Sequence, residues 1–325
     1  MKVVITGGAG FLGRRLADLL LQRGYVLGPA GQVEPLETLV IFDAVAPTPP
    51  LAHDPRVQIV RGDLCDAAAL ARAIDLHTRS VFHLAAVVSA AAEADFDLGM
   101  RVNLHGTIAV LEACRALPQP PRLVFTSSLA AFGGELPEIV DDTTPLAPQT
   151  SYGTQKAIAE LLINDYSRKG FLDGRVLRLP TIVVRPGKPN QAASSFASSI
   201  IREPLTGTDA VCPVTPETRL AILSPRRAID ALLHAHALPP EAWGMFRCLN
   251  VPALSVTVAE MLEALRRVAG PRPLGRIHWQ PDATIQRIVG SWPRFFTSQR
   301  ARQLGFQTDS SMDEIVQGFV EDYLT

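Results

Sequence analysis

A tyrosine and a lysine four residues apart, Tyr152 and Lys156, are the residues whose types and spacing best suit chemistry. On a helix, side chains at positions i and i+4 lie on one face, so this phenol and ammonium would share one space. A phenol with an ordinary pKa of about 10 is a poor base at neutral pH, but a neighbouring cation favours the phenolate. The chain has four tyrosines and four lysines against 27 arginines, so chance predicts roughly 0.05 such pairs. The pair predicts proton transfer by Tyr152, with its pKa lowered by Lys156; the alternative is an exposed helical pair.

Two serines, Ser127 and Ser128, directly follow an apolar run at 122–126 that is typical of a strand. The carboxyl edge of a parallel sheet is where ligands bind, and a hydroxyl there can hydrogen-bond a substrate oxygen. Serines at strand ends are also common turn formers. The position of these serines at the strand end is typical of a substrate-binding hydroxyl and of a turn former alike.

Three glycines, Gly7, Gly10 and Gly13, follow the first apolar run at 2–6 and precede a helical pattern. Glycine allows a tight turn and a close approach of a pyrophosphate to the backbone, and the helix N-terminus beyond offers N–H groups. An ordinary glycine-rich turn is the alternative. The strand, turn and helix context favours dinucleotide binding.

An aspartate, Asp43, ends the second apolar run at 38–42. A carboxylate at this place hydrogen-bonds the adenosine ribose and repels a 2′-phosphate, which favours NAD over NADP. The spacing from Gly13 exceeds the usual ~20 residues, and we expect a loop insertion at 28–37 to account for it. A solvated aspartate at a strand end is the other interpretation.

The elements that must position these residues alternate between strands and helices over the first 180 residues. Continuous β-branched runs are typical of strands buried on both faces of a parallel sheet. Expected strands lie at 2–6, 38–42, 57–60, 80–84, 122–126 and 175–179, and expected helices at 66–77, 95–117 and 152–169. The alternation predicts an α/β fold with a doubly wound, Rossmann-type parallel sheet.

Beyond residue 180 the alternation loosens, and proline and glycine crowd 186–216. We expect a dinucleotide-binding domain at 1–180 and a smaller C-terminal substrate lobe at 181–325, partly interwoven with it. Within the lobe we expect a helix at 228–238, a strand at 246–251 and capping boxes at Thr257/Glu260 and Ser311/Glu314.

The composition excludes several classes of protein. The 325 residues are 47% hydrophobic and 19% charged, which excludes a disordered chain. The 31 cations and 32 anions exclude a strongly basic nucleic-acid binder. Four scattered cysteines without a C-x-x-C motif predict neither a disulfide framework nor a metal site. We expect a cytoplasmic protein without a signal peptide or a membrane span.

Together these motifs resemble the extended short-chain dehydrogenase/reductase superfamily over essentially the whole chain. The resemblance implies that Ser128, Tyr152 and Lys156 are catalytic, with Ser127 in reserve, and that Asn103 supports the loop or the cofactor. The cofactor-binding residues that it implies are Gly7, Gly10, Phe11, Leu12, Gly13, Asp43, Asp63, Leu64, Ala85, Ala86, Asn103, Tyr152, Lys156, Pro180 and Ile182.

Within that superfamily, residues 148–213 are similar to the D-erythronate dehydrogenases of bacterial sugar-acid catabolism. The similarity implies NAD-dependent oxidation of the 2-hydroxyl of a short sugar acid to a 2-oxo acid. A carboxylate substrate needs a cation, and Arg185 is the first candidate because guanidinium binds carboxylates bidentately; a surface arginine is the alternative. Ser89 and Asn190 are further candidates for the substrate pocket, beside Ser128 and Tyr152.

Two other functions compete with the dehydrogenase. A sugar-nucleotide epimerase would share the architecture, and four arginines of the second half would then bind a pyrophosphate: Arg219, Arg226, Arg227 and Arg247. A dehydratase is disfavoured because Leu129 and Ala130 stand where such enzymes carry acids. The third candidate is a non-catalytic NAD-binding protein. Helices at 95–117 and 152–169 form dimers in many relatives, so we expect a homodimer.

Overall fold

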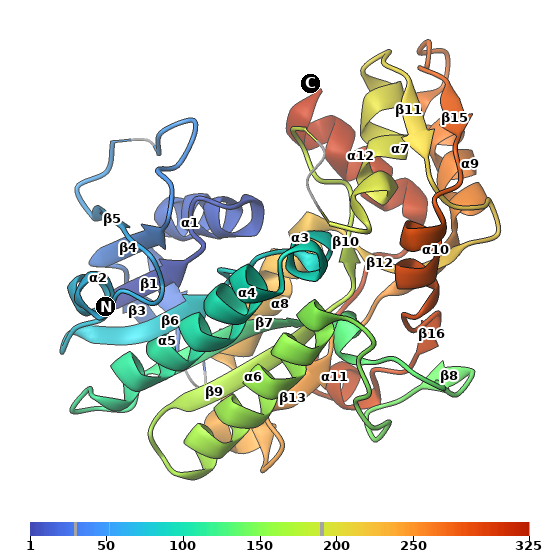
Figure 1. The fold of residues 1–325 in the computed structure, drawn as a ribbon. Coiled ribbons are helices and arrows are strands. Elements are labelled where there is room, and N and C mark those ends of the chain that lie inside the picture. The colour runs from blue at the N-terminus through green and yellow to red at the C-terminus, as the bar shows by residue number, and fades with distance from the viewer. Residues whose placement is uncertain (29–30, 52, 189–191, 325) are drawn as a thin grey trace.

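A seven-stranded sheet forms the centre of the computed structural model, which describes residues 1–28, 31–51, 53–188 and 192–324 (Figure 1). Its order is β13-β9-β7-β6-β1-β4-β5, and all neighbouring strands are parallel. The strands are β1 (Lys2–Thr6), β4 (Thr38–Asp43), β5 (Val57–Arg61), β6 (Thr78–His83), β7 (Arg122–Ser128), β9 (Asp173–Leu179) and β13 (Cys248–Asn250). The predicted α/β fold with a doubly wound parallel sheet is confirmed.

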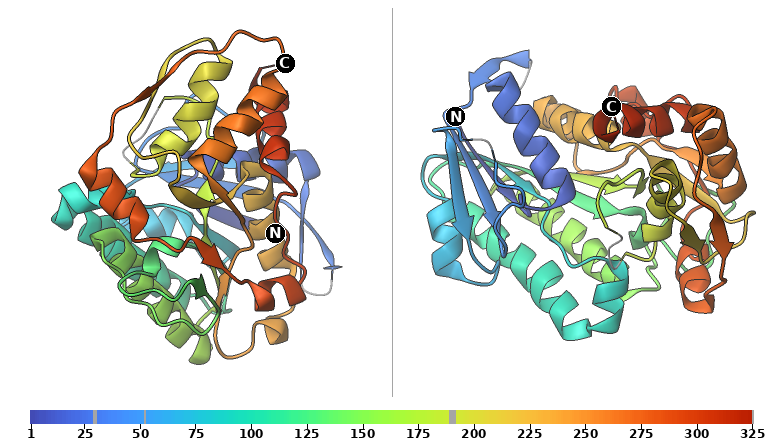
Figure 2. Two further views of the ribbon diagram at one scale, coloured as in Figure 1. Left: turned by 90° about the vertical axis from the view of Figure 1, so that its right-hand side faces the viewer. Right: turned by 90° about the horizontal axis from the view of Figure 1, so that it is seen from above.

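Both faces of the sheet are covered by helices, which explains the uninterrupted apolar runs. Val3 and Ile5 of β1 pack in one core with helices α1 and α8, whereas Val4 packs in another with α2, α5 and α6. Successive strand residues point to opposite faces, so a central strand covered on both faces is mostly apolar. Seen from above, α1 and α8 lie on one side of the sheet and α4 to α6 on the other (Figure 2).

The structure contains the expected helices, with one interruption, and also α3, α7, α10 and α11, which the sequence pattern did not predict. They are α1 (Phe11–Arg23), α2 (Ala67–Ala73), α3 (Ser89–Ala94), α4 (Phe96–Gly99), α5 (Gly106–Arg115), α6 (Ser151–Arg168), α7 (Ser195–Leu205), α8 (Pro225–Ala237), α9 (Val258–Ala269), α10 (Ala283–Gly290), α11 (Gln299–Gln303) and α12 (Met312–Tyr323). The single helix expected at 95–117 is wrong, because a π-helical segment, Met100–His105, separates α4 from α5. Sequence periodicity does not reveal such a segment, since one wide turn hardly changes the apolar pattern.

The loop insertion expected at 28–37 is also partly wrong. β2 (Tyr25–Leu27) and β3 (Val33–Pro35) pair antiparallel as a small hairpin. Val26 and Leu36 are buried in the core beside α1, which ties the hairpin to the domain. The insertion therefore has regular structure of its own.

The remaining strands build a smaller second lobe with its own apolar core. β10 (Thr181–Ile182), β12 (Arg219–Leu223) and β14 (Leu254–Thr257) form a three-stranded sheet, and α7, α9 and α12 supply most of the core. Short pairs join β11 (Ala210–Cys212) to β15 (Ile277–Trp279) and β8 (Ile139–Val140) to β16 (Phe295–Phe296). The Thr257/Glu260 capping box of α9 is present. At α12, Ser311 caps the helix, but Glu314 accepts from Ser310 instead of completing the box.

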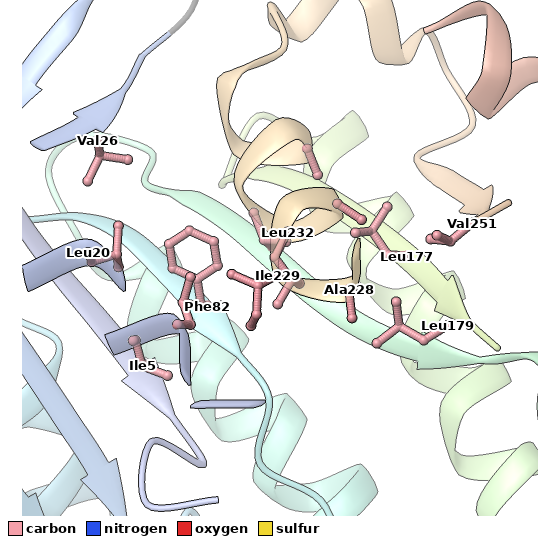
Figure 3. Packing of buried hydrophobic residues seen from close by; sticks show 14 of the residues in the cluster. Ile5, Leu20, Val26, Phe82, Leu177, Leu179, Ala228, Ile229, Leu232 and Val251 are labelled. Carbon is pink, nitrogen blue, oxygen red and sulfur yellow. The ribbon is translucent and has the colours of Figure 1, made fainter. Parts of the chain in front are cut away.

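Two elements from beyond residue 180 belong to the first domain. β13 is the edge strand of the central sheet, and Ile229 and Leu232 of α8 pack beside Phe82 and Leu177 of that sheet (Figure 3). The chain therefore returns to the first domain after building part of the second lobe. A boundary at residue 180 stays a prediction. Among the described residues, no helix is long and apolar enough to cross a membrane.

Candidate active site

A cavity of about 400 Å³ lies at the carboxyl ends of the central strands, between the two lobes. The chain reverses its direction of strand addition between β1 and β6, and this switch point is where open α/β sheets bind ligands. The cavity brings together thirteen of the predicted site residues: Gly7, Gly10, Phe11, Leu12, Gly13, Ala86, Ser89, Ser128, Tyr152, Lys156, Pro180, Ile182 and Arg185.

The glycine turn has a backbone shape that side chains would obstruct. Gly7 has a φ of +72°, and a Cβ on Gly13 would lie 2.3 Å from the Gly7 carbonyl oxygen. Gly10 caps α1 without a side-chain hydrogen bond, and the first turn of α1 has no acidic residue. The positive end of the helix dipole therefore faces the cavity without an acidic residue in the first turn of α1, which fits the pyrophosphate of a dinucleotide.

Asp43 lies at the carboxyl end of β4, beside the glycine turn, and does not line the cavity. Its carboxylate accepts hydrogen bonds from the backbone of Ala9 at 3.0 Å and of Val45 at 3.2 Å. It thus fastens the turn to the neighbouring strand. A carboxylate oxygen can accept more than one hydrogen bond, so this position also fits a ribose hydroxyl.

Four further predicted cofactor residues lie outside the cavity lining: Asp63, Leu64, Ala85 and Asn103. Asp63 accepts from the Cys65 amide and pairs with Arg101, and Leu64 is buried. The Ala85 backbone lies so close to Gly7 that a Cβ added to Gly7 would lie 2.6 Å from the Ala85 amide nitrogen. Asn103 exchanges two hydrogen bonds with the backbone of Val87, so it holds the loop after β6.

Tyr152 and Lys156 lie on α6 and both face the cavity. The helix begins just before them because the Thr150 hydroxyl accepts from the Gly153 amide. Lys156 Nζ lies 5.6 Å from the centre of the Tyr152 ring and donates to the Thr126 carbonyl oxygen at 2.8 Å. It also lies 4.4 Å from the centre of the Phe125 ring. The helix thus places the phenol and the ammonium in one space.

The protein's own groups move the pKa values of this pair in opposite directions. Burial raises the pKa of Tyr152 to about 12, against the lowering effect of the Ser128 hydroxyl. Burial lowers the pKa of Lys156 to about 7, and Glu160 opposes this. The expected lowering of the Tyr152 pKa is therefore absent in the protein alone, because desolvation outweighs the hydroxyl and Lys156 is turned toward Thr126.

The two strand-end serines differ in their partners. Ser128 caps a short 3-10 turn by accepting from the Ala130 amide at 3.1 Å. The buried Ser127 hydroxyl donates to Glu160, which also forms a bidentate ion pair with Arg178. The Ser127 hydroxyl is therefore occupied by its interior hydrogen bond to Glu160. Sequence reasoning missed Glu160, although its position four residues after Lys156 places it on the same helix face.

The far end of the cavity is lined by the second lobe. The Arg185 amide donates to Ser198 Oγ at 3.0 Å, and its guanidinium donates to the Lys188 carbonyl oxygen at 2.7 Å. Burial and neighbouring Arg202 lower the pKa of Arg185. In the described part of the chain, no carboxylate pairs with the Arg185 guanidinium. Ser89 Oγ accepts from the Ala193 amide, and Asn190 lies outside the described residues.

The cavity also contains residues that sequence reasoning did not assign to the substrate pocket. They include Arg219, Trp292 and Pro293. No local motif marks these residues. All four arginines considered for a pyrophosphate pair with acids, and only Arg219, paired with Glu260 at 3.6 Å, is among the described residues that line this cavity. The other partners are Glu321 and Asp322 for Arg226, Asp230 and Glu314 for Arg227, and Asp173 for Arg247.

A doubly wound sheet with a glycine turn at its switch point, and a tyrosine–lysine pair at the same edge, define a Rossmann-type oxidoreductase. The chain belongs to the NAD dependent epimerase/dehydratase family, whose model matches residues 3–229. It is an NAD-dependent dehydrogenase, and the glycine turn and Asp43 fit this cofactor.

Three similar proteins cover nearly the whole chain. D-erythronate dehydrogenase from Cupriavidus necator is 58% identical over 99% of this chain and 98% of its own length. D-erythronate dehydrogenase from Haemophilus influenzae is 49% identical over 99% of both. A solved structure described as a nucleoside-diphosphate-sugar epimerase from Agrobacterium tumefaciens has a TM-score of 0.89 and 44% identity, and covers 100% of this chain and 94% of that one.

Proposed function

We propose that this protein oxidises the 2-hydroxyl of D-erythronate to give 2-oxo-tetronate, with NAD as the hydride acceptor. The observation that carries the proposal is the convergence of Ser128, Tyr152 and Lys156 on the cavity that the glycine turn also lines. The names of the two similar dehydrogenases support the substrate. The chain supplies a base, a hydroxyl and a cation at one place, which alcohol oxidation requires.

The protein's part in the reaction is proton transfer and orientation. The Tyr152 phenolate accepts the proton of the C2 hydroxyl, so the O–H bond breaks as the carbonyl forms. The Ser128 hydroxyl donates a hydrogen bond to that oxygen, and the Lys156 ammonium favours the phenolate. NAD, when bound, takes up the hydride that leaves C2. Holding the reacting carbon and the base in one orientation supplies much of the rate.

Arg185 is the proposed partner of the substrate carboxylate, with Ser89 and Asn190 as further polar contacts. The Arg185 guanidinium is partly buried without a paired carboxylate among the described residues, and burial disfavours its charged form. A bound carboxylate would supply the missing counter-charge through a charge-assisted hydrogen bond. In this proposal the acid is recognised by the second lobe.

The experiment is an assay of the purified protein with four-carbon and longer aldonates, scored by NADH absorbance, with NADP in a parallel series. We expect NADH to accumulate with D-erythronate and NAD, and the ketone product to be captured as a hydrazone. Activity confined to UDP-sugars would contradict the proposal.

A sugar-nucleotide epimerase is the second candidate, and the description of the Agrobacterium structure favours it. Arg219 lines the cavity and is the one of the four arginines that could reach a ligand there. An epimerase returns the hydride to its substrate and accumulates no NADH. The same assay therefore separates the two candidates.

We also propose a cytoplasmic homodimer. Leu161 on α6 and Phe96 on α4 are 64% and 59% exposed, and burying them against a second copy would remove apolar surface from water. Light scattering on the purified protein measures the mass directly. A monomer at micromolar concentration would contradict the dimer.

A further inference from the structure

A buried ion pair lies directly behind the catalytic end of α6. Glu160 is 1% exposed and Arg178 of β9 is 3% exposed. The guanidinium binds both carboxylate oxygens, with Nη2 at 2.7 Å and Nε at 3.0 Å from Oε2. Buried charges cost several kcal/mol to desolvate, and apolar residues would often serve stability as well. The proposed proton transfer makes no use of this pair, so its place beside the site needs another reason.

Glu160 is connected to both sides of the proposed catalytic group. On α6 it lies one turn after Lys156 on the same face. Toward the sheet it accepts the hydroxyl proton of Ser127, the residue before Ser128. The Glu160 carboxylate thus contacts β7, the strand that carries Ser128, and lies on the same face of α6 as Lys156.

The groups around Lys156 leave Glu160 as the anion that opposes its loss of charge. On α6, Tyr152 is the other titratable neighbour, and its raised pKa keeps it neutral near pH 7 in the protein alone. From β6, burial lowers the pKa of His83 to about 3, so this ring is neutral as well. From β7, Lys156 meets the Phe125 ring and the Thr126 carbonyl oxygen.

The groups around Glu160 are Arg178 from β9 and the thiol of Cys248 from β13. Burial raises the pKa of this thiol well above its usual value, so it carries no charge. Arg178 also donates to Asn250 Oδ1 at 3.2 Å, and Asp142 acts on it from a distance. Glu160 still acts to raise the pKa of Lys156 with Arg178 in place, and Arg178 is not among the causes that move this pKa.

We propose that Glu160 is a positioning residue that favours the ammonium form of Lys156 and holds the strand end that presents Ser128. Arg178 is the partner of this carboxylate in the buried ion pair. The role of the ammonium in turnover rests on the proposed function, but the effect of Glu160 on Lys156 is a property of the protein alone.

The experiment reads Lys156 directly in the protein without cofactor. The chain has four lysines, so labelling with ¹³C at the ε carbon gives four NMR signals. The signal lost in Lys156→Met is that of Lys156. We expect Glu160→Gln to lower the midpoint of its titration by about one pH unit or more.

Glu160→Asp is the matched control, because it keeps a carboxylate at this position. We expect its Lys156 midpoint to stay within about half a pH unit of that of the unmodified protein. Where Glu160→Gln does not fold, the double variant Glu160→Gln/Arg178→Gln leaves no unpaired buried charge and should also show a lowered midpoint. Equal shifts in Glu160→Asp and Glu160→Gln, or no shift in a folded Glu160→Gln, would overturn the proposal.

A second readout is the pH profile of NADH formation. With Lys156 losing its proton at lower pH, the alkaline limb of kcat/KM, which reports the free enzyme, should move down in pH in Glu160→Gln, in the same direction as the NMR midpoint. A purely structural role would lower the melting temperature and leave both the limb and the midpoint in place. Absence of turnover with any aldonate would count against the proposed function, whereas the NMR result tests Glu160 by itself.

Discussion

The two ends of the cavity are built in different ways. The part of the cofactor end that the glycine turn forms is backbone from one continuous segment, β1 and the turn into α1, where a Cβ on Gly13 would lie 2.3 Å from the Gly7 carbonyl oxygen. The substrate end is made of side chains such as Arg185, Arg219 and Trp292, which come from separate segments of the second lobe. Backbone geometry restricts residue type at fixed spacing, whereas a side-chain pocket can be assembled from many positions. The glycine turn is therefore recognisable in a sequence, whereas of the substrate end the sequence predicted Arg185 and not Trp292.

Tyr152 lies where the two ends of the cavity meet, and we expect its replacement to have the largest effect on activity. We expect Tyr152→Phe to lower kcat about 10²- to 10⁴-fold, because the chain loses its base. Steady-state NADH formation measures it. Tyr166→Phe is the matched control, since this phenol lies on the same helix and contacts Glu112 instead of the cavity. A Tyr152→Phe variant as active as the control would refute the catalytic scheme.

At the cofactor end, Gly13→Ala should weaken NAD binding about 100-fold or more. The added Cβ would lie 2.3 Å from the Gly7 carbonyl oxygen, so the turn must open where the pyrophosphate approaches. We also expect about 1–3 kcal/mol of lost stability, as in other overpacked sites. Calorimetric titration with NAD measures the affinity. Gly290→Ala is the control, because a Cβ there meets nothing within 4 Å. Unchanged affinity in Gly13→Ala would show that the cofactor end tolerates side chains after all.

At the substrate end, Arg185→Gln should raise KM for D-erythronate about 10- to 100-fold, the cost of one charge-assisted hydrogen bond. The affinity for NAD should change little, because the two ends use different segments. Arg226→Gln is the control, since this arginine pairs with Glu321 and Asp322 on the surface. If Arg219→Gln raises KM and Arg185→Gln does not, the carboxylate lies at Arg219 instead.

The smallest expected effect is on the pH dependence of the free energy of unfolding. Burial lowers the pKa of Lys156 from 10.5 to about 7 in the folded chain, whereas the unfolded chain keeps the ordinary value. Between these values the unfolded chain binds more protons at this residue, so raising the pH favours folding. The gain is at most about 1.4 kcal/mol per pH unit. Urea unfolding from pH 7 to 9 should show a shallower rise for Lys156→Met. Equal slopes would mean that the folded chain keeps Lys156 charged.

The sequence by itself determined the central sheet and the parts of the site that depend on local geometry. Apolar runs such as 2–6 predicted strands buried on both faces, and the Tyr152–Lys156 spacing predicted a shared helix face; both depend on short-range periodicity. The glycine turn was predictable because its three glycines lie at short, fixed spacing between a predicted strand and a predicted helix.

Only the tertiary structure decided what depends on contacts between distant segments. It brought β13 and α8 back to the first domain, paired Ser127 with Glu160, and placed Arg185 and Arg219 at one cavity. It also reversed the expected direction of the Tyr152 pKa, because desolvation is a property of the packed interior and not of neighbours in sequence. The spacing of residues in the sequence specifies which side chains lie on one helix or strand. Packing in the folded chain specifies the pKa values of those side chains and their hydrogen-bond partners.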